Sequence, residues 1–386
     1  MERPGIKYHG LLSVLFAIWI CIPLVYDLFT KSKDLLISQS ENRMLARRPK
    51  LNSANLLIFS AAYEKFYNDH FFLRWELIHW NSFLVKYSFF HKSPVPAEVD
   101  LGNSGWLFTA GKEREVYEGN YNLPESYIDA ICNELSLRNK WYAERGITFY
   151  LAIAPMKCEV YPENLPSYYH RSKTGTLTDI LMARFRKDTS LRIIELKPAM
   201  TAAKEKGVVF YPTDNHWNAL GAYWAYRAIT DRMQHDFPKI HPLKEDGFRI
   251  VSERGKGGNL ATMIGLYEFL HETYQKTYIR HPRSVIGNKA GYPSPKGFSY
   301  PDEYELVRLN PDTSLPRIVV IRDSFFTALL PYMSENFSKS VYIFDNWKYE
   351  RQEEIVKMEK PDIVLLEILE SNLSQILSCL AVDQKK

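Results

Sequence analysis

The sequence has few cysteines and nearly equal numbers of basic and acidic residues. The first feature argues against a disulfide-rich or metal-binding protein, and the second against a nucleic-acid-binding protein. Its four cysteines stand at positions 21, 132, 158 and 379 without a CxxC pair, so neither a metal-binding motif nor a disulfide framework is indicated. A Cys132–Cys158 bridge stays open for an oxidising compartment, with unpaired thiols as the alternative. Lys and Arg number 49 against 45 Asp and Glu, with both signs interspersed. This pattern gives no electrostatic footprint for nucleic acid.

Internal repeats and low-complexity tracts are also missing, which excludes solenoids and propellers. The clearest long apolar run is residues 10–29, which carry no charge before Asp27. That length reaches the lower limit for spanning a bilayer, and no small-residue cleavage site follows it. We therefore expect residues 1–31 to be an uncleaved signal anchor, one transmembrane helix with the basic N-terminus inside and the rest exported. The alternative is a cytosolic protein with a buried N-terminal helix.

Two regions are expected after the anchor. Residues 32–100 form an aromatic-rich lead-in, where residues 61–72 carry apolar side chains at helical intervals. Residues 101–386 alternate between strands and helices. Short apolar runs predict strands at 147–154, 191–196, 208–211, 317–322 and 362–368, and helices are predicted at 122–146, 216–235, 324–336 and 349–359.

Nearly continuous apolar strands separated by helices are typical of a parallel sheet covered on both faces. The fold class is therefore α/β, a three-layer α/β/α sandwich with a mostly parallel sheet. Ligands of such sheets bind outside the carboxyl ends of the strands. Polar clusters that follow the predicted strands are consequently the candidates for a functional site.

Two such clusters together contain the parts of a catalytic triad. Ser324 follows strand 317–322 and precedes a predicted helix, whose N-terminal amides could stabilise an oxyanion. Asp214 and His216 follow strand 208–211. A serine hydroxyl needs an imidazole to accept its proton, and the imidazole needs a carboxylate to orient it. The sequence supplies all three groups at one edge of the sheet.

Each cluster also has a purely structural interpretation. A serine at a helix start is an ordinary N-cap, and Asp214 could cap the next helix while His216 packs beside Trp217. The shared position at the sheet edge favours catalysis over these separate explanations. A metal site made of Asp214, His216 and Asp323 lacks a recognisable ligand set.

The order of the motifs resembles a known family. Asp214-Asn215-His216-Trp217 precedes Arg322-Asp323-Ser324-Phe325 by about a hundred residues. This order is similar to that of the AlgJ/AlgX alginate O-acetyltransferases and their DHHW-type relatives, which are SGNH-hydrolase-like. Ordinary SGNH hydrolases have the two blocks in the opposite order, so this one looks circularly permuted. Further family-like pieces are Glu41-Asn42-Arg43, Gly105-Trp106-Leu107-Phe108, Pro155-Met156-Lys157 and Gly258-Asn259-Leu260.

The resemblance implies a role for each triad residue and a set of partners. Ser324 would be the nucleophile, His216 the general base and then acid, and Asp214 the residue that orients His216. Ser324 would pass an acetyl group to a hydroxyl of an exported polysaccharide, with a membrane-bound O-acyltransferase as the acetyl donor. No metal, nucleotide or flavin cofactor is implied. The protein would be a single-pass protein of the cell inner membrane with a periplasmic catalytic domain.

Departures from the family pattern and rival functions stay open. Arg322 stands where a plain motif has Gly, and Asn259 where relatives often have Asp. Arg322, Lys157 and Tyr161 are candidate substrate contacts. The alternatives are an Arg322–Asp323 pair and, for the other two, a solvated loop. The same triad would serve an acetyl-esterase, because only the acceptor differs. A catalytically silent glycan-binding or assembly protein is the rival of another class.

Overall fold

The structure is a computed structural model that describes residues 10–18, 21–22, 37–38, 43–51, 56–71, 73–87, 98–120, 123–186, 190–295, 298–344 and 351–376. The chain divides into two compact units, Met1–Pro96 with Ala261–Glu268, and Ala97–Leu260 with Phe269–Lys386. The expected anchor, residues 1–31, lies largely outside the described residues. Among the residues that are described, no helix is both long enough and apolar enough to cross a membrane.

The first unit is built mainly from two helices. They are α2 (Leu56–His70) and α3 (Arg74–Tyr87), and a short strand pair, β1 (Ile37–Ser38) and β2 (Arg43–Met44), precedes them. Helix α2 covers most of the helical segment expected at 61–72. The segment 261–268 joins this unit through a hydrogen bond between His79 Nδ1 and the Gly265 carbonyl.

The second unit is centred on a sheet whose described strands run in the order β6-β5-β13-β11-β12-β10-β9. The first five of these are parallel and the last two pair antiparallel at one edge. The mostly parallel α/β fold expected from the sequence is thereby confirmed. The strand bounds are β5 (Thr148–Ala154), β6 (Arg192–Glu195), β9 (Val285–Ile286), β10 (Glu305–Leu309), β11 (Arg317–Arg322), β12 (Lys339–Phe344) and β13 (Ile363–Leu369).

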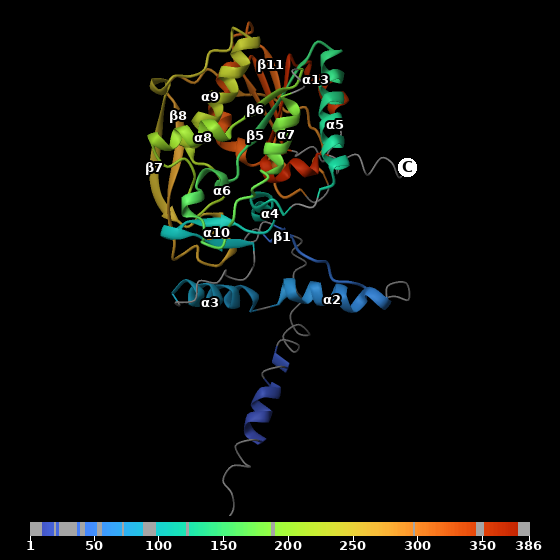
Figure 1. Ribbon diagram of the computed structural model, residues 1–386, viewed down its shortest axis with the longest axis vertical. Helices are drawn as coiled ribbons and strands as arrows, with labels where there is room; N and C mark the ends of the chain where they lie inside the picture. The colour runs from blue at the N-terminus through green and yellow to red at the C-terminus, as the bar shows by residue number, and fades with distance from the viewer. Residues whose placement is uncertain are drawn as a thin grey trace, which may run out of the picture. The chain divides into compact units, whose positions relative to one another are not determined.

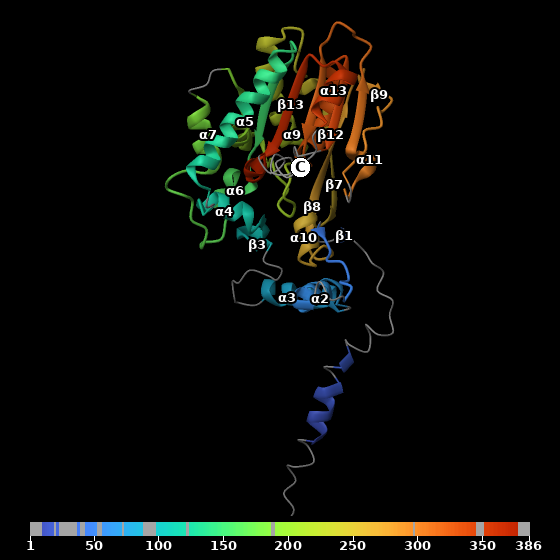
Figure 2. The ribbon, with the colours of Figure 1, turned by 90° about the vertical axis from the view of Figure 1, so that its right-hand side faces the viewer.

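Helices cover both faces of this sheet, because its strands present apolar side chains on both sides. Tyr150 and Ala152 of β5 belong to one buried cluster, and Phe149 and Leu151 to the other. Figures 1 and 2 show the two helical layers on either side of the sheet. One layer contains α5 (Glu125–Ala143), α7 (Leu177–Phe185) and α13 (Gln352–Glu359), and the other α8 (Lys197–Ala203), α9 (Ala219–Asp236) and α12 (Leu330–Met333).

Shorter elements complete the second unit. They are β3 (Val99–Leu101), β4 (Leu107–Thr109), α4 (Lys112–Glu118), α6 (Lys157–Val160), α10 (Asn259–Met263) and α11 (Pro301–Tyr304), except that residues 261–263 of α10 belong to the first unit. A separate antiparallel hairpin consists of β7 (Phe248–Lys256) and β8 (His271–Ile279). The sequence did not predict this hairpin, since its strands are largely exposed and rich in charged residues.

Two predicted elements differ in the structure. Residues 208–211 are not a sheet strand, because the backbone around Val208 and Val209 is hydrogen-bonded by Asn218 and only an isolated bridge joins Phe210 to Trp217. The helix expected at 324–336 is broken into η5 (Phe325–Leu329), α12 and η6 (Ser334–Asn336). Pro331, near the start of α12, has no N–H to continue a helical ladder through it.

The cysteines carry no bridge in the described part of the chain. Cys132 and Cys158 are both free, so the alternative of unpaired thiols holds for this pair. Cys158 is buried, and burial raises the pKa of its thiol. A buried thiol held in the protonated form is unreactive.

Candidate active site

The candidate site lies at the carboxyl edge of the central sheet. Strand β11 ends at Arg322, and Ser324 follows after one residue. The loop that carries Asp214 and His216 comes from outside the sheet and leads into α9. The structure therefore brings together residues that are 108 positions apart in the sequence.

A continuous chain of hydrogen bonds links the three residues. Nδ1 of His216 lies 2.7 Å from Oδ1 of Asp214, and Nε2 lies 2.8 Å from Oγ of Ser324. When the ring proton is on Nδ1, Nε2 accepts a hydrogen bond from the Ser324 hydroxyl. The His216 side chain is 27% exposed, so small molecules can reach the group. This is the geometry that a serine nucleophile and its base require.

The Asp214 carboxylate is held by two further donors. The His216 amide donates to Oδ1 at 3.0 Å, and the Asn259 amide donates to Oδ2 at 2.9 Å. Burial alone would raise the pKa of Asp214. The hydrogen bond and charge of His216, together with these amides, outweigh it and lower the pKa to about 2. Asp214 is therefore ionised at neutral pH and fixes the orientation of the imidazole.

Gly258 explains why the Asn259 amide can reach Asp214. A Cβ atom at Gly258 would lie 2.6 Å from Cβ of Asp214 and 2.9 Å from the Thr213 carbonyl oxygen. The Gly258 amide also donates to the Thr213 hydroxyl at 2.8 Å. Only glycine allows the two segments to approach this closely, which gives the Gly258-Asn259 motif a direct structural purpose.

Lys157 anchors the loop of Asp214 to the end of β5. Its ammonium group donates to the carbonyl oxygens of Tyr211 at 3.1 Å, Pro212 at 3.1 Å and Asp214 at 2.6 Å. The side chain is only 2% exposed. This differs from the expected contact with substrate, because every N–H group of Lys157 is used to hold backbone.

The charge state of Lys157 follows from its surroundings. Burial lowers its pKa to about 7, while the charges of Asp214, Glu113 and Glu272 oppose this shift. Three carbonyl acceptors require three N–H donors, which only the ammonium form has. The ring of Phe108, 5.2 Å from Nζ, also favours a cation. We therefore assign the charged form in the assembled site.

Arg322 and Tyr161 are likewise buried and hold backbone. Arg322, fully buried, donates to the carbonyls of Asp323 and Glu303 and to the Thr327 hydroxyl. It does not pair with the Asp323 carboxylate in the way the sequence suggested. The hydroxyl of Tyr161 accepts the Val209 amide at 2.9 Å. Both side chains point away from solvent, so neither is placed to contact a substrate.

The turn at Ser324 is fixed by a second buried carboxylate. Asp323 accepts the Phe325 amide on one oxygen and the Leu369 amide on the other, each at 2.8 Å. Glu367 accepts the Asp323 amide at 3.2 Å and is fully buried. Burial raises the pKa of Glu367 well above its ordinary value, and the neighbouring Asp323 charge adds to the effect. Burial also raises the pKa of Asp323, so the surroundings of this pair favour the protonated form of each carboxyl group.

The helix whose N-terminal amides were expected to stabilise an oxyanion differs in the structure. A single short 3-10 segment follows Ser324 instead of a regular helix, and the Phe325 amide is already bonded to Asp323. Among the described residues, the Ser324 amide has no hydrogen-bond partner. This leaves the Ser324 amide as the donor that can face charge developing on a substrate oxygen.

Trp217 joins the two halves of the site. Its indole N–H donates to the Phe325 carbonyl at 2.9 Å, and the two rings pack edge to face with centroids 5.1 Å apart. Phe325 also packs against the His216 ring at 4.8 Å. The loop of His216 and the turn of Ser324 are thus held against one another.

Two buried carboxylates near the site, Glu272 and Glu113, were not predicted from the sequence. Glu272 of β8 accepts the amide and the hydroxyl of Thr213 at 2.8 and 2.7 Å. Glu113 of α4 is 7% exposed, and burial raises its pKa to about 7 against the influence of Thr109, Lys157 and His216. Neither residue lies in a recognisable motif. Within the described residues, no group of three His, Cys, Asp or Glu side chains is arranged to hold a metal ion.

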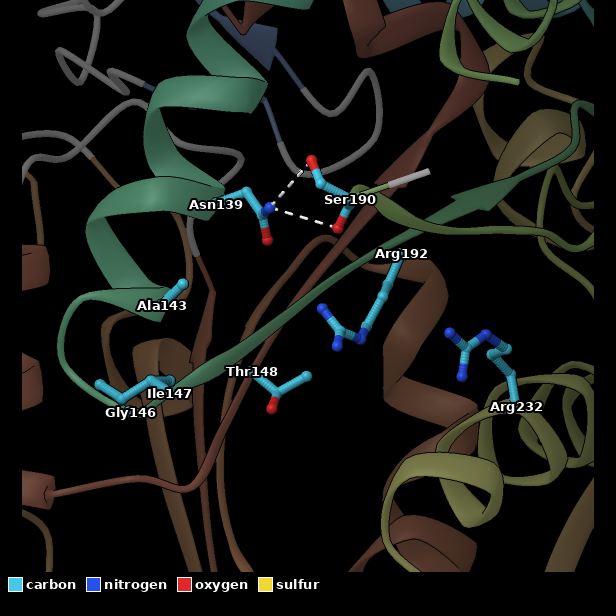
Figure 3. A pocket seen from close by; sticks show the side chains of 8 residues that line it. All are labelled: Asn139, Ala143, Gly146, Ile147, Thr148, Ser190, Arg192 and Arg232. Carbon is cyan, nitrogen blue, oxygen red and sulfur yellow. Dashed lines mark hydrogen bonds between the residues drawn. The ribbon is translucent and has the colours of Figure 1, made fainter. Parts of the chain in front are cut away.

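A cavity of about 480 Å³ lies at the opposite edge of the sheet, where β5 begins (Figure 3). Arg192 and Arg232 lie side by side in it, and both donate to the Asp236 carboxylate at 2.9 Å. This ion pairing satisfies part of their charge. Among the described residues, the lining includes the hydroxyl groups of Thr148 and Ser190 but no histidine that could activate them. The cavity is separate from the site at Ser324.

The fold and the hydrogen-bonded Ser-His-Asp chain define the class as an SGNH-hydrolase-like α/β protein. Residues 99–291 match the family described as "SGNH hydrolase-like domain, acetyltransferase AlgX", and these 193 of 386 residues are half of the chain. The chain therefore belongs to this family, and the resemblance expected from its motifs is confirmed. The match includes Asp214 and His216, whereas Ser324 lies beyond it.

Similar proteins include two with the name "Probable alginate O-acetylase AlgJ". The one from Pseudomonas aeruginosa is 27% identical over 188 residues, which are 47% of this chain and 44% of the relative. The one from Pseudomonas syringae pv. tomato is 30% identical over 201 residues, 50% of this chain and 49% of the relative. The chain thus matches just under half the length of these relatives. The solved structure of Bacillus cereus PatB1 has the same fold, with 18% identity, a TM-score of 0.51 and coverage of 70% of this chain and 95% of that one.

Proposed function

We propose that this protein is a serine-dependent O-acetyltransferase that moves an acetyl group through an acyl-Ser324 intermediate to a hydroxyl of an exported polysaccharide. The observation that carries the proposal is the chain of hydrogen bonds from Asp214 through His216 to Ser324, at 2.7 and 2.8 Å. Membership of an acetyltransferase family supports the acetyl group as the one transferred.

In the first half-reaction, Ser324 Oγ attacks the acetyl carbonyl carbon of the donor while His216 Nε2 takes the hydroxyl proton. The tetrahedral intermediate collapses, the bond to the donor oxygen breaks, and His216 returns the proton to that oxygen. Asp214 stays ionised throughout, since its pKa of about 2 lies far below neutral pH. Its negative charge stabilises the transient imidazolium. The Ser324 amide is the donor that we assign to the oxyanion.

In the second half-reaction, a sugar hydroxyl takes the place of the donor oxygen. His216 accepts the proton of that hydroxyl, the sugar oxygen attacks the acyl carbon, and the ester bond to Ser324 breaks as Oγ regains its proton. No oxidant, metal or nucleotide enters this balance.

The proposal also specifies the acetyl acceptor, the acetyl donor and the location of the catalytic domain. The names of the AlgJ relatives support a polysaccharide acceptor of the alginate kind. A membrane-bound O-acyltransferase is the proposed source of acetyl groups. The proposed location of the catalytic domain is outside the cytoplasm, where an exported glycan is accessible.

A transfer assay tests this function against its alternatives. The protein is incubated with an activated acetyl ester and an oligosaccharide, and products are separated by mass spectrometry. An acetylated oligosaccharide supports transfer, whereas free acetate alone, at a rate that the oligosaccharide does not change, supports an acetyl-esterase. Absence of both products in folded protein would favour a catalytically silent binding protein.

A further inference from the structure

The cavity of about 480 Å³ at the amino edge of the central sheet has the features of a ligand site (Figure 3). It lies where the parallel strands β5 and β6 begin, and α5 and α9 supply further lining residues, among them Asn139 and Arg232. Small-molecule sites in proteins usually have volumes of about 300–1,000 Å³. The cavity is therefore large enough for a small organic molecule and not only for a single ion.

One carboxylate oxygen holds the two arginines of the cavity in place. Oδ2 of Asp236 accepts hydrogen bonds from Nε of Arg192 and Nη1 of Arg232, each at 2.9 Å. The same oxygen accepts the Tyr150 hydroxyl at 2.6 Å. Burial alone would raise the pKa of Asp236, but its hydrogen bonds, that of Tyr150 foremost, outweigh burial and lower the pKa below its ordinary value. Asp236 is therefore ionised and fixes both guanidinium groups from one side.

Most donors of the two guanidinium groups are left over by this contact. A guanidinium group has five N–H donors, and within the described residues Arg192 and Arg232 each give one of them to Asp236. Their side chains are 35% and 37% exposed and line the cavity, so the other donors are accessible from it. The two positive charges also outweigh the single negative charge of Asp236. An anion that enters the cavity meets donors that are already oriented.

The number and origin of these donors favour a phosphate group over a carboxylate. A carboxylate that pairs with one guanidinium fork uses both of its oxygens. A phosphate group has three terminal oxygens that accept hydrogen bonds, which is enough for two forks. Arg192 begins β6 and Arg232 lies near the end of α9, so the two forks reach the cavity from different elements (Figure 3). A tetrahedral acceptor can be approached from both directions.

Polar groups on the α5 side of the cavity suit the remainder of such a ligand. The side-chain nitrogen of Asn139 donates to the Ser190 carbonyl at 3.2 Å, which leaves the side-chain oxygen of Asn139 as an acceptor for a ligand hydroxyl. The hydroxyl of Thr148 lines the same space. The cavity thus combines a cationic end with an end that accepts hydrogen bonds.

From these observations we propose that the cavity binds a small phosphate monoester, with its phosphate group on Arg192 and Arg232 and a hydroxyl group on Asn139. The site is distinct from the acyl transfer assigned to Ser324 and carries out no reaction. A ligand held there joins the end of α9 to the start of β6, two elements of the folded state only. Binding should therefore raise the midpoint of thermal unfolding.

Calorimetric titration of the full chain at constant ionic strength tests the site with glycerol phosphate, glycerate and glycerol. Glycerate carries a carboxylate in place of the phosphate group, and glycerol carries neither. Glycerol phosphate should bind at one site, at least about tenfold more tightly than glycerate, because it engages the second fork. Glycerol should give no measurable binding. Equally tight binding of glycerate, or no saturable binding of glycerol phosphate by the folded protein, would overturn the proposal.

Arg232→Gln removes one of the two forks and should weaken the binding of glycerol phosphate at least about tenfold. Arg227→Gln is the matched control, because it removes an arginine of the same helix that pairs with Asp231 and does not line the cavity. The control should bind glycerol phosphate as the unaltered protein does. Equal affinity in the two variants would assign Arg232 a purely structural role and overturn the proposal.

A second pair of variants leaves the ion pairs of Asp236 intact. Ser190 is exposed and lines the cavity, so both Ser190→Asp and Ser190→Asn should fold. The negative charge of Ser190→Asp should weaken the binding of glycerol phosphate about fivefold relative to the neutral Ser190→Asn. Equal affinity in these two variants would contradict an anion in the cavity. None of these measurements involves an acetyl donor, so their outcome is independent of the function proposed for Ser324.

Discussion

Lys157 shows how a single buried charge can organise a reactive site without touching the reacting atoms. Its ammonium group donates hydrogen bonds to three carbonyl oxygens of the segment Tyr211–Asp214. These bonds fix the backbone that carries the Asp214 carboxylate, which is bonded to His216. Tyr161 and Arg322 act in the same manner on Val209 and on the turn at Ser324. Residues at the ends of the strands thus position the loops of the site.

Lys157→Met should lower kcat for acetyl-ester turnover about 10- to 100-fold, because small displacements of a catalytic group are costly. The KM for the ester should change by less than about twofold, since Lys157 does not face the substrate. Steady-state kinetics of Lys157→Met check this prediction. Lys140→Met, which removes an exposed lysine, is the matched control. A rise in KM with unchanged kcat would assign Lys157 to substrate binding instead.

Glu113 should make the stability of the protein depend on pH. Burial raises its pKa from 4.5 to about 7, so its contribution to stability is fully present below pH 4.5 and is lost as the pH rises through about 7. Glu113→Gln removes this dependence. The free energy of unfolding of the variant, relative to that of the unaltered protein, should therefore increase between pH 5 and 8 by on the order of 3 kcal/mol.

Urea unfolding at several pH values between 5 and 8 measures this difference. Glu115→Gln, a substitution in the same helix at a residue that is exposed, is the matched control and should show no such trend. A difference between Glu113→Gln and unaltered protein that is constant over this range would rule out the elevated pKa.

At the scale of elements, the site depends on three segments meeting: the loop before α9, the turn after β11 and the segment before α10. Trp217 links the first two through the Phe325 carbonyl. Trp217→Phe keeps an aromatic ring but removes the N–H. The variant should lose about 1 kcal/mol of stability and turn over acetyl esters roughly tenfold more slowly.

Trp224→Phe, which removes an indole within α9, is the matched control. Thermal unfolding and kinetics of the two variants separate the effect on the site from the general loss of an indole. Equal activity in the two variants would show that the link between loop and turn is dispensable.

The third segment is tested at Gly258. A methyl group there would overlap Asp214 at 2.6 Å, so Gly258→Ala should displace the carboxylate and lower activity at least about tenfold. The matched control is Gly247→Ala, whose added Cβ would have an ordinary contact at 3.6 Å with Leu243. Acetyl-ester turnover of the two variants gives the comparison, and full activity of Gly258→Ala would contradict the packing described.

At the scale of the whole molecule, the central parallel sheet could be predicted from the sequence, because its strands are short apolar runs. Strand β13 reads IVLLEIL with every residue buried, and such a run has few alternatives to a central parallel strand. The pattern of β7 and β8 failed to predict a hairpin, because its outward face carries charges and tyrosines in place of a regular alternation. Ser324 and His216 were predicted as partners from motif order. Their contact depends on tertiary packing that no local pattern contains.

The roles of Lys157 and Glu113 could not be predicted for a related reason. A charged residue after a strand is usually exposed, and only the surrounding carbonyls and carboxylates of other segments make burial tolerable here. The expected membrane anchor, residues 1–31, stays a prediction, because most of that segment lies outside the described residues. The expected location outside the cytoplasm stays a prediction as well.

The central claim is that Ser324 carries the acetyl group during the reaction. Intact-mass spectrometry of the full chain after brief exposure to an activated acetyl ester tests it directly. The account predicts an increase by the mass of one acetyl group, located on the peptide that contains Ser324, and absent in Ser324→Ala. An adduct that persists in Ser324→Ala, or a folded protein that forms no adduct and does not turn over the ester, would contradict it.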